Sequence, residues 1–221
     1  MAVRIWLVLV LMLGGCGSDG GLGGRPSGGG TGTTTPECGA LDQACIGQAL
    51  DAPLVLGGRL ELAIDFHVGG STGPPLTVET ADPTILYTEA SDLLAAGEGA
   101  SAVLFVGPDE QVVDFIHVWV TPADELRVLR WSDAGDLLGE VQPEIQLLVG
   151  DELLVSIEPY AAAQPLLGNF ALERAVTGTA VAIVPDPVAA WYRLVAREAG
   201  ASTVTFSGVE LETTIDIEVL P

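Results

Sequence analysis

Cysteine thiols have the most specific chemistry of the side chains in this sequence, and Cys16 has a distinctive setting. It follows one positive charge at Arg4, an apolar run over residues 5–13, and two glycines. A charged start, an apolar middle and small residues before a cut are the marks of a secretory signal peptide. The run is too short to span a bilayer, which takes about 20 apolar residues. A signal peptide over residues 1–15 therefore leaves a thiol at the cleavage point, either modified or simply free.

The stretch over residues 13–16, Leu-Gly-Gly-Cys, resembles the cleavage box of bacterial lipoproteins. In that family the thiol is lipidated and becomes the new N-terminus, and several acyl chains, palmitate among them, give a permanent anchor. The resemblance implies that Cys16 is lipidated. It also implies the outer membrane of a Gram-negative envelope, because Gly17 stands where an Asp would favour inner-membrane retention. The Gly-, Ser- and Thr-rich composition of residues 16–36 predicts a flexible, disordered linker after the anchor.

The other two cysteines, Cys38 and Cys45, are close in sequence. In an exported chain such a pair favours a disulfide, here one that closes a small loop at the foot of the folded region. A zinc site would need four ligands, and this segment offers two. A redox pair is usually spaced as Cys-x-x-Cys. We therefore predict a structural disulfide.

Carboxylates and histidines are the remaining candidates for catalysis or metal binding. Asp65 and His67 share one face of a predicted strand, as a solvent-facing polar pair would, and His117 should also face solvent. The sequence contains no nucleophile elbow, phosphate loop or zinc-protease motif, so we expect neither an enzyme nor a cofactor. Carboxylates in predicted turns are weak calcium candidates without a calcium-loop signature, and solvated turn residues are the default. These carboxylates are Asp82, Asp109, Glu110, Asp133, Asp136 and Asp151.

The charge balance limits the partners. Eight basic residues, all arginine, stand against thirty acidic ones, for a formal net charge of −22. Nucleic-acid binding needs a basic footprint, so it is excluded as a function class. Adhesion to anionic lipid surfaces is disfavoured for the same reason. The membrane contact that we expect is the lipid anchor, and the other partners that we expect are an envelope protein or a carbohydrate.

Aromatic residues are few, and Trp119 is the most informative of them. It alternates with Ile116, Val118 and Val120, which places it on the outward face of a strand. An outward tryptophan marks a binding surface unless other parts of the chain cover it. A cover by the next domain, or by a hairpin predicted over residues 126–140, is the interpretation that we favour. The remaining aromatic residues of note are expected in a core or domain interface: Trp131, Trp191 and Tyr192.

These residues must be positioned by strands, because the chain after the linker is a loose repeat of strand patterns. Gly99-Ala-Ser-Ala-Val-Leu-Phe105 matches Gly200-Ala-Ser-Thr-Val-Thr-Phe206, and alternating strands ending at Pro122 and Pro221 follow the two copies. Period-2 alternation and Gly/Pro turns predict β-sandwiches. Residues 188–198 contain good helix formers, but their place in the repeat predicts that the second part of this segment is a strand.

The second copy, from Ala196 through Gly200-Ala-Ser-Thr-Val204 to the closing strand at Val219, resembles bacterial immunoglobulin-like domains. Such domains occur in invasin- and intimin-like adhesins and in surface lipoproteins. The resemblance implies an all-β fold of two tandem immunoglobulin-like β-sandwich modules, which we place at residues 37–122 and 123–221. The family shares no catalytic residues, so no active site is carried over.

Together these observations predict a lipid-anchored cell-envelope protein with a non-catalytic structural, adhesion or partner-binding role. The alternative is an accessory lipoprotein that captures a divalent cation or a carbohydrate, through the acidic loops or Trp119. Both functions place the protein outside the cytoplasm.

Overall fold

The computed structural model describes residues 21–22, 30–37, 52–68, 71–89, 92–186 and 191–221, with the backbone alone for 21–22, 30–37, 63–68 and 71–72. Cys16, Cys38, Cys45 and the signal peptide lie outside the described residues, and so does the side chain of His67. Every helix or strand element in these ranges is a strand, so the all-β prediction is confirmed. Within the same ranges there is no helix with the length and apolarity needed to cross a membrane.

The first sandwich packs a sheet in the order β1-β2-β4-β8-β7 against a sheet in the order β3-β10-β9-β6. The strands of the first sheet are β1 (Gly21–Leu22), β2 (Gly30–Glu37), β4 (Arg59–Val68), β8 (Asp92–Ala95) and β7 (Leu86–Glu89), with β5 (Ser71–Thr72) also paired to β4. Those of the second are β3 (Leu54–Val55), β10 (Val112–Thr121), β9 (Gly99–Val106) and β6 (Thr77–Thr80).

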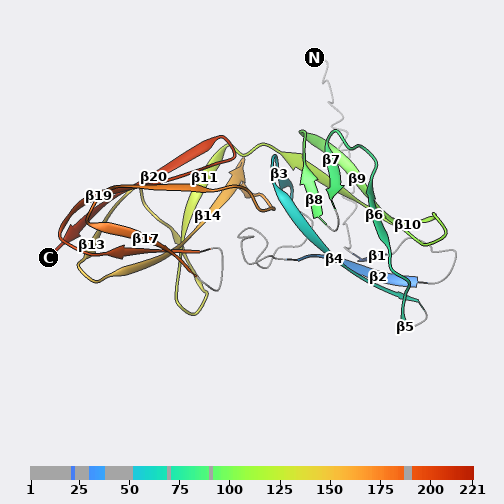
Figure 1. Cartoon of the computed structure of the whole chain (residues 1–221), viewed down its shortest axis with the longest axis horizontal. Coiled ribbons are helices and arrows are strands. Elements are labelled where there is room, and N and C mark those ends of the chain that lie inside the picture. Colours follow the sequence, from blue (N-terminus) through green and yellow to red (C-terminus); the bar gives the residue numbers. More distant parts are fainter. Residues whose placement is uncertain (1–20, 23–29, 38–51, 69–70, 90–91, 187–190) are drawn as a thin grey trace, which may run out of the picture.

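The second sandwich has corresponding sheets in the orders β12-β11-β14-β18-β17 and β13-β20-β19-β16, with the first two strands of the larger sheet exchanged relative to the first sandwich (Figure 1). The strands of its first sheet are β12 (Leu137–Glu140), β11 (Glu125–Trp131), β14 (Glu152–Ala161), β18 (Tyr192–Ala196) and β17 (Val181–Pro185), with β15 (Gln164–Pro165) paired to β14. Those of its second sheet are β13 (Glu144–Leu148), β20 (Leu211–Leu220), β19 (Gly200–Gly208) and β16 (Glu173–Gly178).

Two local predictions are confirmed in this repeat. β11 and β12 form the antiparallel hairpin around the Asp-Ala-Gly-Asp turn, with Leu129 opposite Glu140. The segment that propensity alone would make helical forms β18, because its apolar side chains at Leu194 and Ala196 are needed in the core between the sheets. Tertiary burial outweighs intrinsic helix propensity here.

Part of the predicted linker differs from the expectation. Residues Gly30–Glu37 form β2 and pair antiparallel with β4 along their whole length, from Gly30 opposite Val68 to Glu37 opposite Glu61. The threonines of this segment favour an extended backbone, and the pairing satisfies amide groups along a strand that would otherwise be an open edge. A segment whose composition predicts a flexible linker thus forms a strand when the open edge of another strand is available for pairing.

Each sandwich has its own apolar core, and the two cores use matching positions. Val103 and Phe105 of β9 are fully buried in the first, and Val204 and Phe206 of β19 occupy the same places in the second. The alternation of these strands therefore fixes which side chains face out.

One residue of the second half of the chain packs in the core of the first sandwich. Leu167, which follows β15 in the second half, is 1% exposed and packs in the core of the first sandwich. Its carbonyl accepts a hydrogen bond from Val55 N–H at 2.9 Å, and its own N–H donates to Pro53 O at 2.8 Å. Two further bonds join Asn169 and Arg59, N–H to carbonyl in both directions, at 2.7 and 2.8 Å. We name residues 166–169 the clasp loop.

The clasp loop depends on a glycine. Gly168 has φ +105°, a left-handed value that L side chains rarely adopt, and a Cβ at this position would lie 2.5 Å from Leu54 Cδ1. The chain can therefore pass this closely over β3 only with glycine at position 168. The close approach lets Leu167 enter the core of the first sandwich.

We expect Leu167→Ala to destabilise the first sandwich by about 2–5 kcal/mol, the cost of a large-to-small change in a closed core. Hydrogen exchange should then rise in β9 and change much less in β19. Leu194→Ala, which empties a fully buried site of the second core, is the matched control and should give the reverse pattern. Equal loss of protection in both strands for Leu167→Ala would show that the residue does not belong to the first core.

Candidate functional site

The outward face of β10 carries the most exposed aromatic side chains of the described chain. Val118 and Val120 point into the core, so alternation turns Phe115, His117 and Trp119 outward. Trp119 is 61% exposed and Phe115 is 53% exposed. The rings of Phe115 and His117 meet edge to face, with centroids 5.4 Å apart.

The neighbouring strand leaves these rings standing clear of the sheet. In the antiparallel register of β9 and β10, Ala100 lies opposite Trp119, and Ala102 lies opposite His117. Methyl side chains at these places cannot cover the rings. Leu104 lies opposite Phe115 and extends the apolar surface. We name these six residues the aromatic face: Ala100, Ala102, Leu104, Phe115, His117 and Trp119.

The structure decides between the two interpretations of Trp119. The hairpin of β11 and β12 pairs with β14 in the second sandwich, and Trp119 is largely open to solvent. The interpretation that the next domain or this hairpin covers Trp119 is therefore wrong. The prediction that His117 faces away from the core is confirmed, since its side chain is exposed.

The carboxylates considered for calcium are mostly engaged with protein donors. Asp82 accepts two hydrogen bonds from Thr84, the hydroxyl at 2.6 Å and the amide at 3.0 Å, and these bonds lower the pKa of Asp82. Asp136 faces the hydroxyl of Ser132, and Asp151 accepts the amide of Leu148. Among the described residues, no three His, Cys, Asp or Glu side chains gather into a group able to hold a metal ion.

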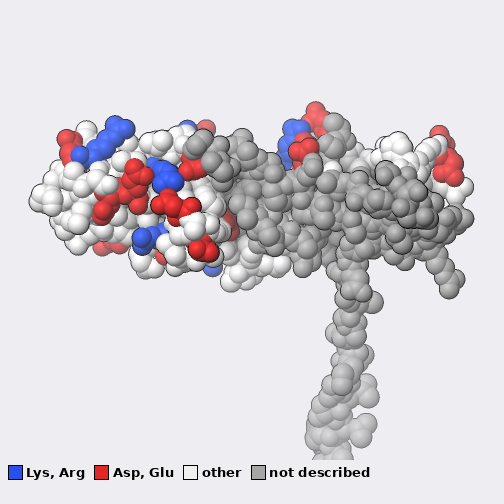
Figure 2. Space-filling view, turned by 90° about the horizontal axis from the view of Figure 1, so that it is seen from below, with Lys and Arg blue, Asp and Glu red and all other residues white. Residues whose placement is uncertain are grey.

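Asp133 belongs instead to an ion-pair network around Arg193. The guanidinium lies 3.0 Å from Asp133, 3.3 Å from Glu152 and 3.2 Å from Asp186. Figure 2 shows the same mixture of acidic and arginine side chains over the second sandwich. The network ties a hairpin turn to neighbouring strands, which is a structural role for these carboxylates.

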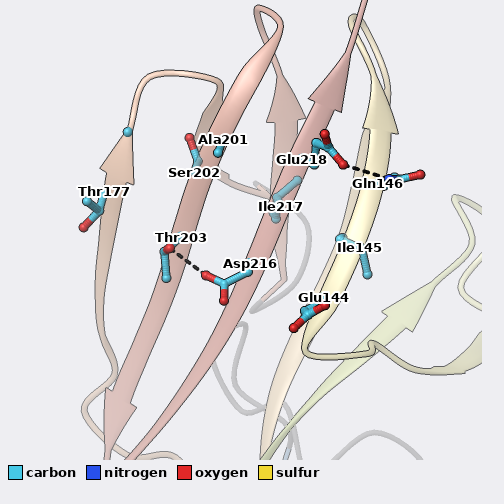
Figure 3. Close-up of a pocket in the computed structure, with 11 residues that line it drawn as sticks. Glu144, Ile145, Gln146, Thr177, Ala201, Ser202, Thr203, Asp216, Ile217 and Glu218 are labelled. Atoms are coloured by element: carbon cyan, nitrogen blue, oxygen red, sulfur yellow. Dashed lines mark hydrogen bonds between the residues drawn. The ribbon is translucent and has the colours of Figure 1, made fainter.

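The second sandwich carries a polar surface at the place that corresponds to the aromatic face. Asp216 and Glu218 of β20 stand where β10 has His117 and Trp119, and with Glu144 they line a groove of about 670 Å³ (Figure 3). Thr203 donates to Asp216 at 2.6 Å, and Gln146 donates to Glu218 at 2.7 Å. The same position of the fold thus presents aromatic rings in one sandwich and carboxylates in the other.

A second unusual group lies on the outward side of β14. Glu158 is only 7% exposed, and it accepts a hydrogen bond from Ser156, whose oxygen in turn accepts Trp131 Nε1 at 2.8 Å. Burial raises the pKa of Glu158 to about 7, and the Ser156 hydrogen bond offsets part of this effect. Alternation along β14 turns Glu158 away from the core, which Leu153, Val155 and Ile157 face, and nothing in the sequence indicates that this side of the sheet is buried.

The predicted interface aromatics divide between two environments. Trp131 and Trp191 stack at 5.0 Å on the outward side of the β11-β14-β18 sheet, half-buried. Tyr192 turns into the core against Phe206, with centroids 5.7 Å apart. The expectation of core positions for these residues is confirmed for Tyr192.

Fold and surface together define an all-β protein of two immunoglobulin-like sandwiches, one with an outward aromatic face. No protein-family model matches the chain, and no curated protein matches it either. Solved structures with similar strand arrangements include domains 5–6 of the S-layer protein SbsC, with 12% identity, 85% of this chain and 99% of that chain covered, and a TM-score of 0.31. At these values the likeness carries no information on function.

Two further bacterial proteins are similar to the same degree. The Escherichia coli adhesin FdeC is 12% identical over 86% of this chain and 63% of that chain, with a TM-score of 0.34. Invasin, a bacterial integrin-binding protein, is 13% identical over 85% of this chain and 40% of that chain, with a TM-score of 0.30.

We expect Glu158 to make stability fall as pH rises. In the folded state, the carboxyl of Glu158 binds a proton more tightly than an exposed glutamate with a pKa of 4.5 does. Its contribution to the free energy of unfolding is therefore fully present below about pH 4.5 and is lost as pH rises through about 7. The free energy of unfolding should fall by on the order of 3 kcal/mol across this pH range. In urea unfolding, Glu158→Gln should lose less stability than the wild type between pH 4.5 and 8.

Glu212→Gln, at an exposed position of β20, is the control for the removal of one negative charge and should follow the wild-type pH profile. A parallel profile for Glu158→Gln and the wild type would contradict the assignment of this titration to Glu158.

Proposed function

We propose that this chain is a lipid-anchored cell-envelope protein with a non-catalytic adhesion or partner-binding role, and that the aromatic face is its contact surface. The exposure of Trp119 and Phe115 on a regular strand is the observation that carries the proposal. Large aromatic side chains contribute most to binding at protein interfaces, and folded chains rarely leave several of them exposed together without a use.

The position of the rings also suits binding. They stand on a ten-residue strand that is hydrogen-bonded to β9 for most of its length, so they are held before any partner arrives. Groups ordered in advance lose little conformational entropy on association. Because β10 is also tied through β3 to the clasp loop, the aromatic face belongs to a firmly connected part of the fold.

The proposed localisation rests on the N-terminal sequence. Arg4, the apolar run over residues 5–13 and Cys16 fit a lipoprotein signal, and Gly17 favours the outer membrane. Stable anchoring needs more than one acyl chain, as lipoprotein cysteines provide. An anchored protein would hold the sandwiches beside the membrane, where an envelope partner is within reach.

A second candidate function rests on the groove of the second sandwich. Its carboxylates and the hydroxyls of Thr177 and Thr203 are groups that bind sugar hydroxyls, so an accessory role in carbohydrate capture would use this groove. Titration with neutral oligosaccharides, followed by the amide signals of β19 and β20, tests this candidate. An absence of shifts at millimolar sugar would remove it.

We expect an exchange of the aromatic face for its counterpart to abolish binding to envelope preparations of the source organism. Phe115→Thr, His117→Asp and Trp119→Glu together install the residues that the second sandwich has at these positions. The changes are on an exposed face, so the melting temperature should stay within a few degrees of wild type. Sedimentation with envelope fragments measures the bound share.

The control exchange is Tyr87→Thr, which removes an exposed ring from β7 in the opposite sheet and should leave binding intact. Unchanged sedimentation of the triple variant, with the fold retained, would overturn the aromatic face as the contact surface.

We expect Cys16→Ser to abolish incorporation of labelled palmitate and to release the protein from the membrane fraction. The thiol is the atom that the acyl chains would be attached to, so no other residue could replace it in this role. Cys38→Ser is the matched control, and it should retain the label. Retention of Cys16→Ser in the membrane fraction would contradict the anchor.

A further inference from the structure

The aromatic rings of the two sandwiches differ in whether an arginine side chain lies over them. In the second sandwich, the guanidinium of Arg127 lies 4.2 Å from the centroid of the Tyr160 ring, and that of Arg174 lies 5.1 Å from Tyr192. Within the described part of the chain, no arginine stands over Phe115 or Trp119. A cation over an aromatic face is attracted by the ring quadrupole, most strongly with tryptophan.

Within its described residues, the first sandwich has a single arginine and no lysine. Between residues 37 and 122 the sequence contains one arginine, Arg59, and no lysine. Arg59 is already paired with Asp92 and lies 3.8 Å from Glu89, both on the opposite sheet. No arginine or lysine among the described residues of the first sandwich is therefore available to lie over the aromatic face.

The border of the aromatic face has the complementary charge. Glu79 of β6 is exposed and lies opposite Leu104 in the register of the sheet. With a net charge of −22, the chain as a whole also attracts cations over distances of several ångströms. Apolar rings with a carboxylate beside them can accept both parts of an arginine, the planar guanidinium and the apolar stem.

From these observations we propose that the aromatic face binds a protein segment that presents arginine side chains. The proposal rests on the proposed function, since it names the partner of the same face. Phe115 and Trp119 are four residues apart on one strand, a separation of about 13 Å. Arginines four residues apart on an extended partner segment match this spacing. A second copy of the chain fits poorly, because two copies that each carry a net charge of −22 repel each other.

The test is a titration with two synthetic peptides at pH 7.5 in 0.15 M salt. One is an extended, Gly/Ser-based peptide with arginines at positions i and i+4, and the other has the neutral isostere citrulline in both places. We expect the arginine peptide to shift the indole signal of Trp119 and to bind at least about fivefold more tightly than the citrulline peptide.

Variants separate a ring contact from simple charge attraction. Trp119→Leu keeps apolar surface but removes the π face, and should weaken arginine-peptide binding about fivefold. Trp119→Phe should restore part of the loss. Glu79→Gln should weaken binding and reduce its salt dependence. Tyr87→Leu, on the opposite sheet, is the control and should bind as the wild type does.

Equal affinity for the two peptides, or equal affinity of the wild type and Trp119→Leu for the arginine peptide, would overturn the inference. Saturable binding of a neutral oligosaccharide at Trp119 would also overturn it and assign a carbohydrate to the face. If the triple exchange abolishes envelope binding but arginine is not preferred, the proposed function stands and this inference alone fails.

Discussion

The clasp loop is the constraint on which the arrangement of the two sandwiches depends. In the second sandwich, β13 runs five residues beside β20, whereas its counterpart β3 runs only two residues beside β10. The first sandwich is therefore short of backbone partners and of apolar volume at this end. Leu167 supplies both, through its side chain in the core and its hydrogen bonds to Pro53 and Val55. Unsatisfied buried amide groups and an unfilled core are each costly, so this contact has a clear physical reason.

The sequence predicts much of the fold, because period-2 alternation and a repeated pattern carry most of the information. The outward positions of His117 and Trp119 follow from alternation alone, and the exposure of Trp119 follows only from the structure, since coverage is set by distant parts of the chain. Leu167 could not be placed from sequence. Leu166 and Leu167, followed by Gly168, form a pattern that does not differ from an ordinary strand end. The burial of Leu167 depends on the other half of the chain. Burial of Glu158 is likewise a tertiary effect.

The repeat explains how one fold supports two kinds of surface. Core positions such as Phe105 and Phe206 are the same in both sandwiches, because both must fill the same space between sheets. Side chains at outward positions do not have to fill the space between the sheets. At one of them the first sandwich has Trp119 and the second has Glu218, so one face is aromatic and the other is acidic.

The second half of the chain, through Leu167, completes the first sandwich. A protein that ends at residue 122 tests it most directly, by hydrogen exchange of the β9 and β10 amides. We expect little protection of these amides in the fragment, with protection restored when the second half of the chain is present. Slow exchange of β9 and β10 in the fragment, equal to that in the whole chain, would show instead that the first sandwich folds without the clasp loop.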